Sequence, residues 1–183
     1  MNDAARLLDA LHFSADRHRD QRRKGASQAP YINHPIEVAH VLASIGGVTD
    51  LDTLLAAILH DTIEDTGTTG GELESRFGPE VRSLVQEVTD DKRLPKEERK
   101  RLQVQQAAQK SAKARMIKLA DKICNVRDVT HAPPSDWSHP RRVAYLDWTM
   151  EVVAGCRGVN PALERHYDEV LETGRRILGI QPG

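Results

Sequence analysis

Apolar residues recur at three- and four-residue intervals along nearly the whole chain, whereas alternating, strand-like runs are almost absent. Leu7, Leu8 and Leu11 show this spacing near the start and mark one face of a first helix. The same spacing predicts further helices at about 33–45, 51–65, 72–77, 79–90, 95–109, 112–129, 137–154 and 161–178. The chain is therefore predicted to be all-α, a compact bundle of about eight or more helices.

Capping residues and prolines separate the predicted helices. Asp50, Ser111 and Asn160 precede the helices that start near 51, 112 and 161. Asn33, followed by Pro35, is expected to cap the helix over 33–45. No such signal interrupts the segment from 51 to 65, so we expect one continuous helix there. Because neither an internal repeat nor a linker divides the sequence, residues 1–183 are predicted to form a single domain.

The composition is that of one soluble globular domain: 39% of the residues are hydrophobic, 29% are charged, and the formal net charge is −1. A nearly neutral chain lacks the broadly basic surface that general nucleic-acid binding needs. The longest apolar run, Leu54–Leu59, is far shorter than the roughly 20 residues of a membrane span. We therefore expect no nucleic-acid partner and no membrane partner.

The first residues and the cysteines indicate a cytoplasmic protein. Asp3 and Asp9 fall where a secretory signal would need a cationic start followed by apolar residues. Cys124 and Cys156 form neither a CxxC pair nor a larger framework, which is typical of reduced thiols. Both observations favour a reducing compartment.

A short string of metal- and proton-competent side chains, His60-Asp61 and then Glu64-Asp65, follows the apolar run. Residues four apart on a helix lie one turn above each other, so two stacked polar pairs are expected. Acidic groups at the C-terminal end of a helix oppose the helix dipole, which suggests a bound cation nearby. The same string is also typical of an exposed acidic helix end with a histidine at the edge of the core. These residues alone leave both interpretations open.

Two further positions favour a metal site. Asp121 lies within an apolar stretch of its helix, where a carboxylate is costly without a charge partner, and His34 stands at the start of another helix. Each of them alone also fits a satisfied polar group of the core. With His60 and Asp61 they supply two imidazoles and two carboxylates, a set suited to a divalent transition metal with positions left for water.

The His34…His60-Asp61…Asp121 pattern resembles that of HD-domain metallophosphohydrolases. The segments that narrow this resemblance are Arg22–Lys24, Pro30–Pro35, Leu59–Asp65, Glu87–Lys92 and Lys118–Lys122. They are similar to the hydrolase half of the RelA/SpoT alarmone enzymes, and most closely to the stand-alone small alarmone hydrolases of the metazoan SpoT homologue type. The resemblance covers about residues 5–178. It implies an HD-domain helical bundle without synthetase or regulatory domains. It also implies Mn²⁺-dependent removal of the 3′-pyrophosphate from (p)ppGpp, giving GDP or GTP plus pyrophosphate.

The resemblance further implies roles for individual residues. The ligands of one Mn²⁺ per chain would be His34, His60, Asp61 and Asp121. The pair that positions and deprotonates the attacking water would be Glu64 and Asp65. The implied contacts to the nucleotide are Arg23 and Lys24 for base and phosphate, Asn125 for the ribose, Tyr145 on the substrate side, and Lys96 and Arg142 for the distal phosphates. Trp137 and Trp148 are interpreted as core or helix-packing residues.

Two other functions stay open at this point. The same site could hold the 2′-phosphate of NADPH, and the local sequence does not separate an NADPH phosphatase from an alarmone hydrolase. A nucleotide-binding module without turnover is the alternative outside enzymes. HD domains of that kind lose ligands, whereas this chain retains all four together with Glu64 and Asp65. We therefore expect a metal-dependent hydrolase whose small-molecule partner is a nucleotide.

Overall fold

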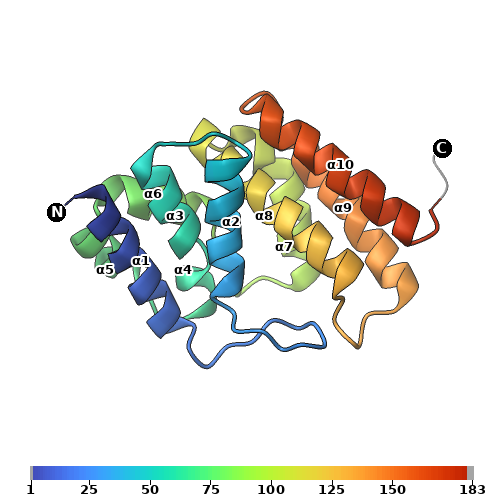
Figure 1. Cartoon of the computed structure of the whole chain (residues 1–183), viewed down its shortest axis with the longest axis horizontal. Coiled ribbons are helices and arrows are strands. Elements are labelled where there is room, and N and C mark those ends of the chain that lie inside the picture. Colours follow the sequence, from blue (N-terminus) through green and yellow to red (C-terminus); the bar gives the residue numbers. More distant parts are fainter. Residues whose placement is uncertain (1, 181–183) are drawn as a thin grey trace.

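The computed structural model describes residues 2–180, and within them it contains ten α-helices and one short 3-10 helix (Figure 1). The helices are α1 (Asp3–Arg17), α2 (Asn33–Ser44), α3 (Leu51–Leu59), α4 (Thr62–Asp65), α5 (Gly70–Phe77), α6 (Pro79–Val88), α7 (Lys96–Gln106), η1 (Ala107–Gln109), α8 (Ala112–His131), α9 (His139–Cys156) and α10 (Pro161–Ile177). The all-α prediction is confirmed. Residue 1 and residues 181–183 of the expected domain lie outside the described residues. No helix in the described range is both long and apolar enough to cross a membrane.

Helix α8 is the central element of the fold. It contacts α2, α3, α6, α9 and α10, and in Figure 1 it lies between the N-terminal helices and the α9–α10 pair. Twelve of its 20 residues are buried, among them charged side chains that belong to the site described below. The predicted apolar run lies in α3, where Leu55 and Leu59 have no exposed surface. One buried cluster joins residues from α1 to α10, so a single core supports the elements that carry the site.

The prediction of one continuous helix over 51–65 is wrong, because the chain breaks at His60 and Asp61 into α3 and the one-turn helix α4. The His60 ring donates a hydrogen bond to the Ala57 carbonyl at 2.8 Å. The Thr62 hydroxyl donates to the Leu59 carbonyl at 2.7 Å. These side chains satisfy the last carbonyls of α3 and so compete with the backbone bonds of a longer helix. The imidazole and the carboxylate therefore lie at a junction between two helices.

Helix starts were predicted correctly where a side chain caps the first turn. Asp50, Ser111 and Asn160 accept hydrogen bonds from backbone N–H groups of α3, α8 and α10. The predicted Asn33 cap is wrong, because Asn33 is the first residue of α2 and no side chain caps that helix. The Asn33 N–H donates to the Pro30 carbonyl at 3.1 Å, so a turn ahead of the helix satisfies this group.

The connection between α1 and α2 folds back onto the C-terminal end of α8 (Figure 1). Gly25 forms an isolated β-bridge with Pro134. A Cβ atom at Gly25 would lie 2.6 Å from the Ala132 carbonyl oxygen, so this close approach requires glycine. The contact holds the neighbouring Arg23 and Lys24 beside α8.

Candidate active site

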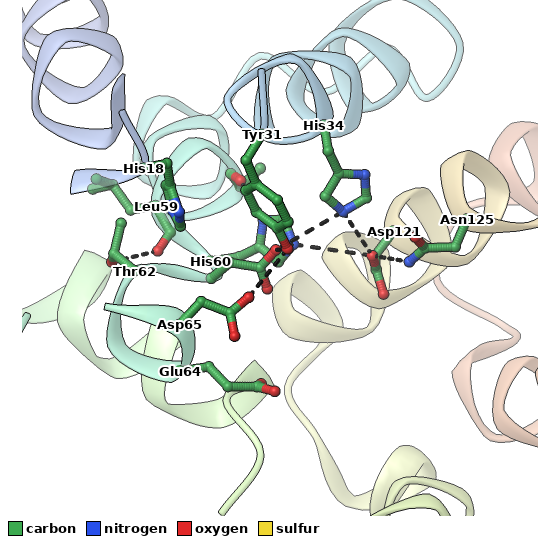
Figure 2. A network of polar contacts seen from close by, with 12 residues as sticks. His18, Tyr31, His34, Leu59, His60, Thr62, Glu64, Asp65, Asp121 and Asn125 are labelled. Carbon is green, nitrogen blue, oxygen red and sulfur yellow. Dashed lines mark hydrogen bonds and ion pairs between the residues drawn. The ribbon is translucent and has the colours of Figure 1, made fainter. Parts of the chain in front are cut away.

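Figure 2 shows that His34, His60 and Asp121, which come from three separate parts of the chain, converge beside α8, and Asp61 directly follows His60. His34 lies in the first turn of α2 and Asp121 in the middle of α8, while His60 and Asp61 form the junction between α3 and α4. The His34 Nε2 atom lies 3.2 Å from Asp121 Oδ1 and 4.0 Å from Asp61 Oδ2. The His60 Nε2 atom lies 3.1 Å from Asp61 Oδ2 and 4.0 Å from Asp121 Oδ1. The fold thus brings together all four residues expected to be metal ligands.

This cluster fits a divalent metal ion. Ligand atoms of His34, His60 and Asp121 lie within 4.8 Å of one another, and Asp61 adds a carboxylate near both imidazoles. The His60 Nδ1 atom donates to the Ala57 carbonyl, so in the neutral ring Nε2 carries the lone pair. That Nε2 atom is buried and has no hydrogen-bond partner among residues 2–180. A cation between the carboxylates would satisfy it.

The electrostatics of the cluster favour ionised carboxylates. Burial opposes protonation of the His60 ring, but the Asp61 and Asp121 carboxylates outweigh burial and raise its pKa to about 9. Burial also opposes ionisation of Asp61, yet the imidazoles of His60 and His34 hold its pKa below the usual range. For Asp121, the Lys122 ammonium outweighs burial and lowers the pKa in the same way. The negative charges needed to attract a cation are therefore present at neutral pH.

Asp121 has the charge partner that its apolar surroundings require. Lys122 Nζ lies 2.9 Å from Asp121 Oδ2, and the Asn125 amide donates to Oδ1. The Lys122 side chain is itself buried, and its ammonium lies 4.8 Å from the centre of the Trp148 ring. The expectation of a partner for Asp121 is confirmed, and the partner is the next residue along α8.

Glu64 lies in α4 and faces the same cavity as the cluster (Figure 2). Its Oε2 atom accepts a hydrogen bond from the Asp90 N–H at 3.0 Å, and its Oε1 atom lies 3.8 Å from an Arg99 nitrogen. Burial raises the pKa of Glu64 above its ordinary value. A carboxylate of raised pKa is a stronger base, so Glu64 can accept a proton within this cavity.

Tyr31 links a candidate metal ligand to Asp65. Its hydroxyl lies 2.6 Å from Asp61 Oδ2 and 3.1 Å from Asp65 Oδ2. Figure 2 shows Tyr31 beside Asp65. Burial, together with these two carboxylates, holds the pKa of Tyr31 well above its usual range, so the hydroxyl stays a donor. The ring stacks on His18 with centroids 4.9 Å apart, and Lys92 pairs with the other Asp65 oxygen. Asp65 is therefore held from two sides.

Two adjoining cavities contain these residues. The inner cavity, of about 160 Å³, is lined by the four candidate ligands, by Glu64 and Asp65, and by Lys118 and Lys122. The outer cleft, of about 610 Å³, lies between the α1–α2 connection and the C-terminal end of α8. Arg23, Tyr31, Asp65 and Asn125 line both. A ligand as large as a nucleotide can occupy the outer cleft and extend one end into the inner cavity.

Most of the residues expected to contact a nucleotide line the outer cleft: Arg23, Lys24, Asn125 and Tyr145. The Arg23 guanidinium donates to Asp128 and, at 3.1 Å, to Asn125 Oδ1. Asn125 in turn donates to Asp121. A chain of hydrogen bonds therefore connects the outer cleft with the inner cavity.

Lys96 and Arg142 do not line either cavity. Arg142 donates to the Val129 carbonyl at 3.1 Å and to the Thr130 carbonyl at 3.0 Å, so it caps the last turn of α8. Burial, together with the positive charge of the neighbouring Arg141, lowers the pKa of Lys96. The structure thus gives Arg142 a structural contact and places Lys96 outside both cavities.

Several residues of the site were not assigned to it from the sequence, among them Tyr31, Lys122 and Trp137. Tyr31 lies three positions before His34, and a tyrosine so close to a candidate ligand is a usable signal. Lys122 directly follows Asp121, which also could have identified it. Trp137 was interpreted as a packing residue; it does pack on Tyr145, with ring centroids 5.3 Å apart, but it also lines the outer cleft. No local pattern distinguishes these two roles of Trp137.

Comparison with known proteins agrees with this arrangement. A family model described as HD domain matches residues 10–146. The guanosine-3′,5′-bis(diphosphate) 3′-pyrophosphohydrolase MESH1 of Xenopus tropicalis is 52% identical over 93% of this chain and 95% of its own length. The human protein of the same description is 53% identical over 89% of this chain and 91% of its own length. A solved structure described as a metazoan orthologue of SpoT that hydrolyses ppGpp superposes with a TM-score of 0.90 at 44% identity, covering 97% of both chains.

Proposed function

The chain belongs to the HD domain family, and from this premise we propose that it hydrolyses (p)ppGpp, releasing pyrophosphate from the 3′ position and leaving GDP or GTP. The observation that carries the proposal is the histidine and carboxylate cluster, which shares one cavity with Glu64 and Asp65 and adjoins a cleft of nucleotide size. The relatives described as hydrolases of this substrate, at 52% and 53% identity, support the choice of nucleotide.

We propose His34, His60, Asp61 and Asp121 as the ligands of one Mn²⁺ per chain. Mixed imidazole and carboxylate donors suit a divalent transition metal. Five carboxylates and three cationic side chains line the inner cavity, so a divalent cation balances its charge when both histidines are neutral. When bound, such an ion lowers the pKa of a water molecule and draws charge from a phosphoryl oxygen.

Glu64 accepts the proton of the attacking water in this proposal, and Asp65 orients that water. The raised pKa of Glu64 supports its role, because a general base works best with a pKa near the operating pH. The contacts of Tyr31 and Lys92 support a fixed position for Asp65. The water oxygen bonds to the phosphorus that carries the ribose 3′-oxygen, the bond between that phosphorus and the 3′-oxygen breaks, and the 3′-oxygen takes up a proton.

The outer cleft receives the nucleoside. Arg23 and Lys24 supply cations and a planar guanidinium at one wall, and Tyr145 and Trp137 supply aromatic surface at another. Asn125 contacts the ribose, because its amide lies between Asp121 and Arg23 at the junction of the two cavities. We propose Lys96 as a further contact to a distal phosphate, although it lines neither cavity.

We also propose that the chain acts as one hydrolase domain in a reducing cytoplasm. The single buried core supports one domain. The two free thiols, Cys124 and Cys156, are both buried and unpaired within the described residues, which supports a reducing compartment.

The test is incubation of the purified protein with Mn²⁺ and either ppGpp or NADPH, followed by anion exchange with separate detection of pyrophosphate and orthophosphate. We expect GDP and pyrophosphate from ppGpp. NADH and orthophosphate from NADPH alone would replace the proposal by an NADPH phosphatase, and no product from either nucleotide would favour a binding module.

Asp61→Asn in the same assay tests whether the cluster carries the activity, and we expect it to abolish turnover. Asp168→Asn is the matched control, because among residues 2–180 Asp168 pairs only with Arg157, on the surface. Full turnover by Asp61→Asn would contradict the proposed ligand set.

A further inference from the structure

Lys118 is a buried lysine of the inner cavity that neither the metal cluster nor the water-handling pair uses. It lies on α8 one turn before Lys122 and three residues before Asp121, and all three side chains line that cavity. Lys118 is only 8% exposed. A buried ammonium is costly unless an anion is close to it, so its presence in a polar cavity calls for a partner.

The anionic groups of the protein around Lys118 already have other partners. Asp121 pairs with Lys122 at 2.9 Å. Glu64 accepts from the Asp90 N–H and lies near Arg99, and the Asp90 side chain accepts from Gln103. Within residues 2–180, Lys118 itself forms no ion pair. It is therefore the cation of the inner cavity that is available to an anionic ligand.

The order of residues along α8 shows which part of a ligand would reach Lys118. Asn125 lines both cavities, Asp121 belongs to the metal cluster, and Lys118 lies still further toward the N-terminus of α8. At about 1.5 Å per residue, Lys118 is roughly 4.5 Å along the axis beyond Asp121. When one phosphate of a ligand lies at the metal cluster, a second phosphate bonded to the first can therefore reach Lys118.

We propose that Lys118 binds the distal phosphate of the 3′-diphosphate and so makes the site selective for a diphosphate over a monophosphate at this position. This inference rests on the proposed function, because it identifies the residue that binds the distal phosphate of the same substrate. An ammonium paired with a phosphate in a buried cavity forms a charge-assisted hydrogen bond. A ligand with a single phosphate, such as the 2′-phosphate of NADPH, has no group that extends to Lys118.

The experiment compares the Mn²⁺-loaded protein with its Lys118→Met variant. Isothermal titration measures the Kd of pyrophosphate and of orthophosphate, and a kinetic assay measures KM for ppGpp. We expect Lys118→Met to weaken pyrophosphate binding by about 10- to 100-fold and to change orthophosphate binding less than about threefold. We expect KM for ppGpp to rise with the pyrophosphate Kd. Lys118→Arg keeps the charge and should retain the preference for pyrophosphate.

Lys113→Met is the matched control, because Lys113 lies on the same helix but pairs with Asp50 and Glu80 at the surface. Lys118→Gln repeats the measurement if the methionine variant does not fold. Equal weakening of both anions, or no weakening, would overturn the proposal; equal weakening would mean that Lys118 acts through its charge on Glu64. Lys118-dependent pyrophosphate binding without ppGpp hydrolysis would instead refute the proposed function and leave the phosphate site standing.

Discussion

The inner cavity and the outer cleft are built in different ways. The inner cavity takes its proposed metal ligands from α2, from α8 and from the junction between α3 and α4, and His34, His60 and Asp121 are 3%, 6% and 8% exposed. The outer cleft takes many of its residues from the two connections that meet at Gly25 and Pro134. Side chains within packed helices have little freedom, whereas those on connections adapt more easily.

Under the proposed function, catalysis takes place in the inner cavity, and the outer cleft determines which nucleotide binds. The inner cavity holds charges that are costly to bury, and most of them are paired and fixed in place, as the contacts of Asp121 and Tyr31 illustrate. The outer cleft is open, and its cations can bind one nucleotide or another without a change in the core. Substitutions in the inner cavity should therefore alter turnover or metal binding, and those in the outer cleft should alter substrate affinity.

The largest effect is expected from Glu64→Gln. Removing the proposed base should lower kcat by about 10²- to 10⁴-fold, because general base catalysis contributes an effect of this size. KM for ppGpp and the affinity for Mn²⁺ should stay within about twofold, since Glu64 is not among the proposed ligands. Steady-state kinetics and isothermal titration measure both. Glu172→Gln, on the exposed side of α10, is the control. Near-normal kcat would remove Glu64 from the mechanism.

Tyr31→Phe is expected to weaken Mn²⁺ binding by about 10- to 100-fold, because the hydroxyl orients the proposed ligand Asp61 from outside the proposed metal site. Isothermal titration of the metal-free protein measures this effect directly. Tyr167→Phe also removes a buried hydroxyl, one that lies 2.8 Å from the Thr149 hydroxyl, and should leave Mn²⁺ affinity unchanged. Equal Mn²⁺ affinity in the two variants would show that Tyr31 does not act on the metal site.

Arg23→Met tests the outer cleft. Loss of its guanidinium should raise KM for ppGpp by about tenfold, the smaller end of the range for a charge-assisted hydrogen bond, with kcat within about twofold. Arg157→Met, which removes only a surface ion pair with Asp168, is the control. A large fall in kcat with unchanged KM would contradict the division between the two cavities.

Arg142→Met is expected to have the smallest effect on activity. Its guanidinium binds the Val129 and Thr130 carbonyls, so the variant should lose about 1–2 kcal/mol of the free energy of unfolding. Denaturant titration measures this loss, and kcat and KM should stay within about twofold. Arg141→Met should leave the free energy of unfolding within about 0.5 kcal/mol, as exposed substitutions usually do. A raised KM without lower stability in Arg142→Met would restore its expected role at a distal phosphate.

The sequence by itself determined the helices and much of the candidate chemistry. Apolar spacing marks a buried face wherever a helix packs, and Asp50, Ser111 and Asn160 cap helices through contacts two or three residues away. Local contacts of this kind depend little on the rest of the fold. A carboxylate in an apolar stretch also predicts a charge partner, even when the sequence does not identify that partner. Asp121, which pairs with Lys122, is the example.

Only the tertiary structure decided which surfaces meet. The break at His60 depends on side chains that bond the last carbonyls of α3, against a propensity that favours a continuous helix. The contacts of Arg142 with α8, the contact of Tyr31 with two carboxylates, and the burial of Lys118 depend on elements that are remote in the sequence. The spacing of apolar residues predicts that one face of a helix is buried, but it does not identify the element that covers this face. Tertiary packing brings together residues that are far apart in the sequence, so local patterns contain no information on these contacts.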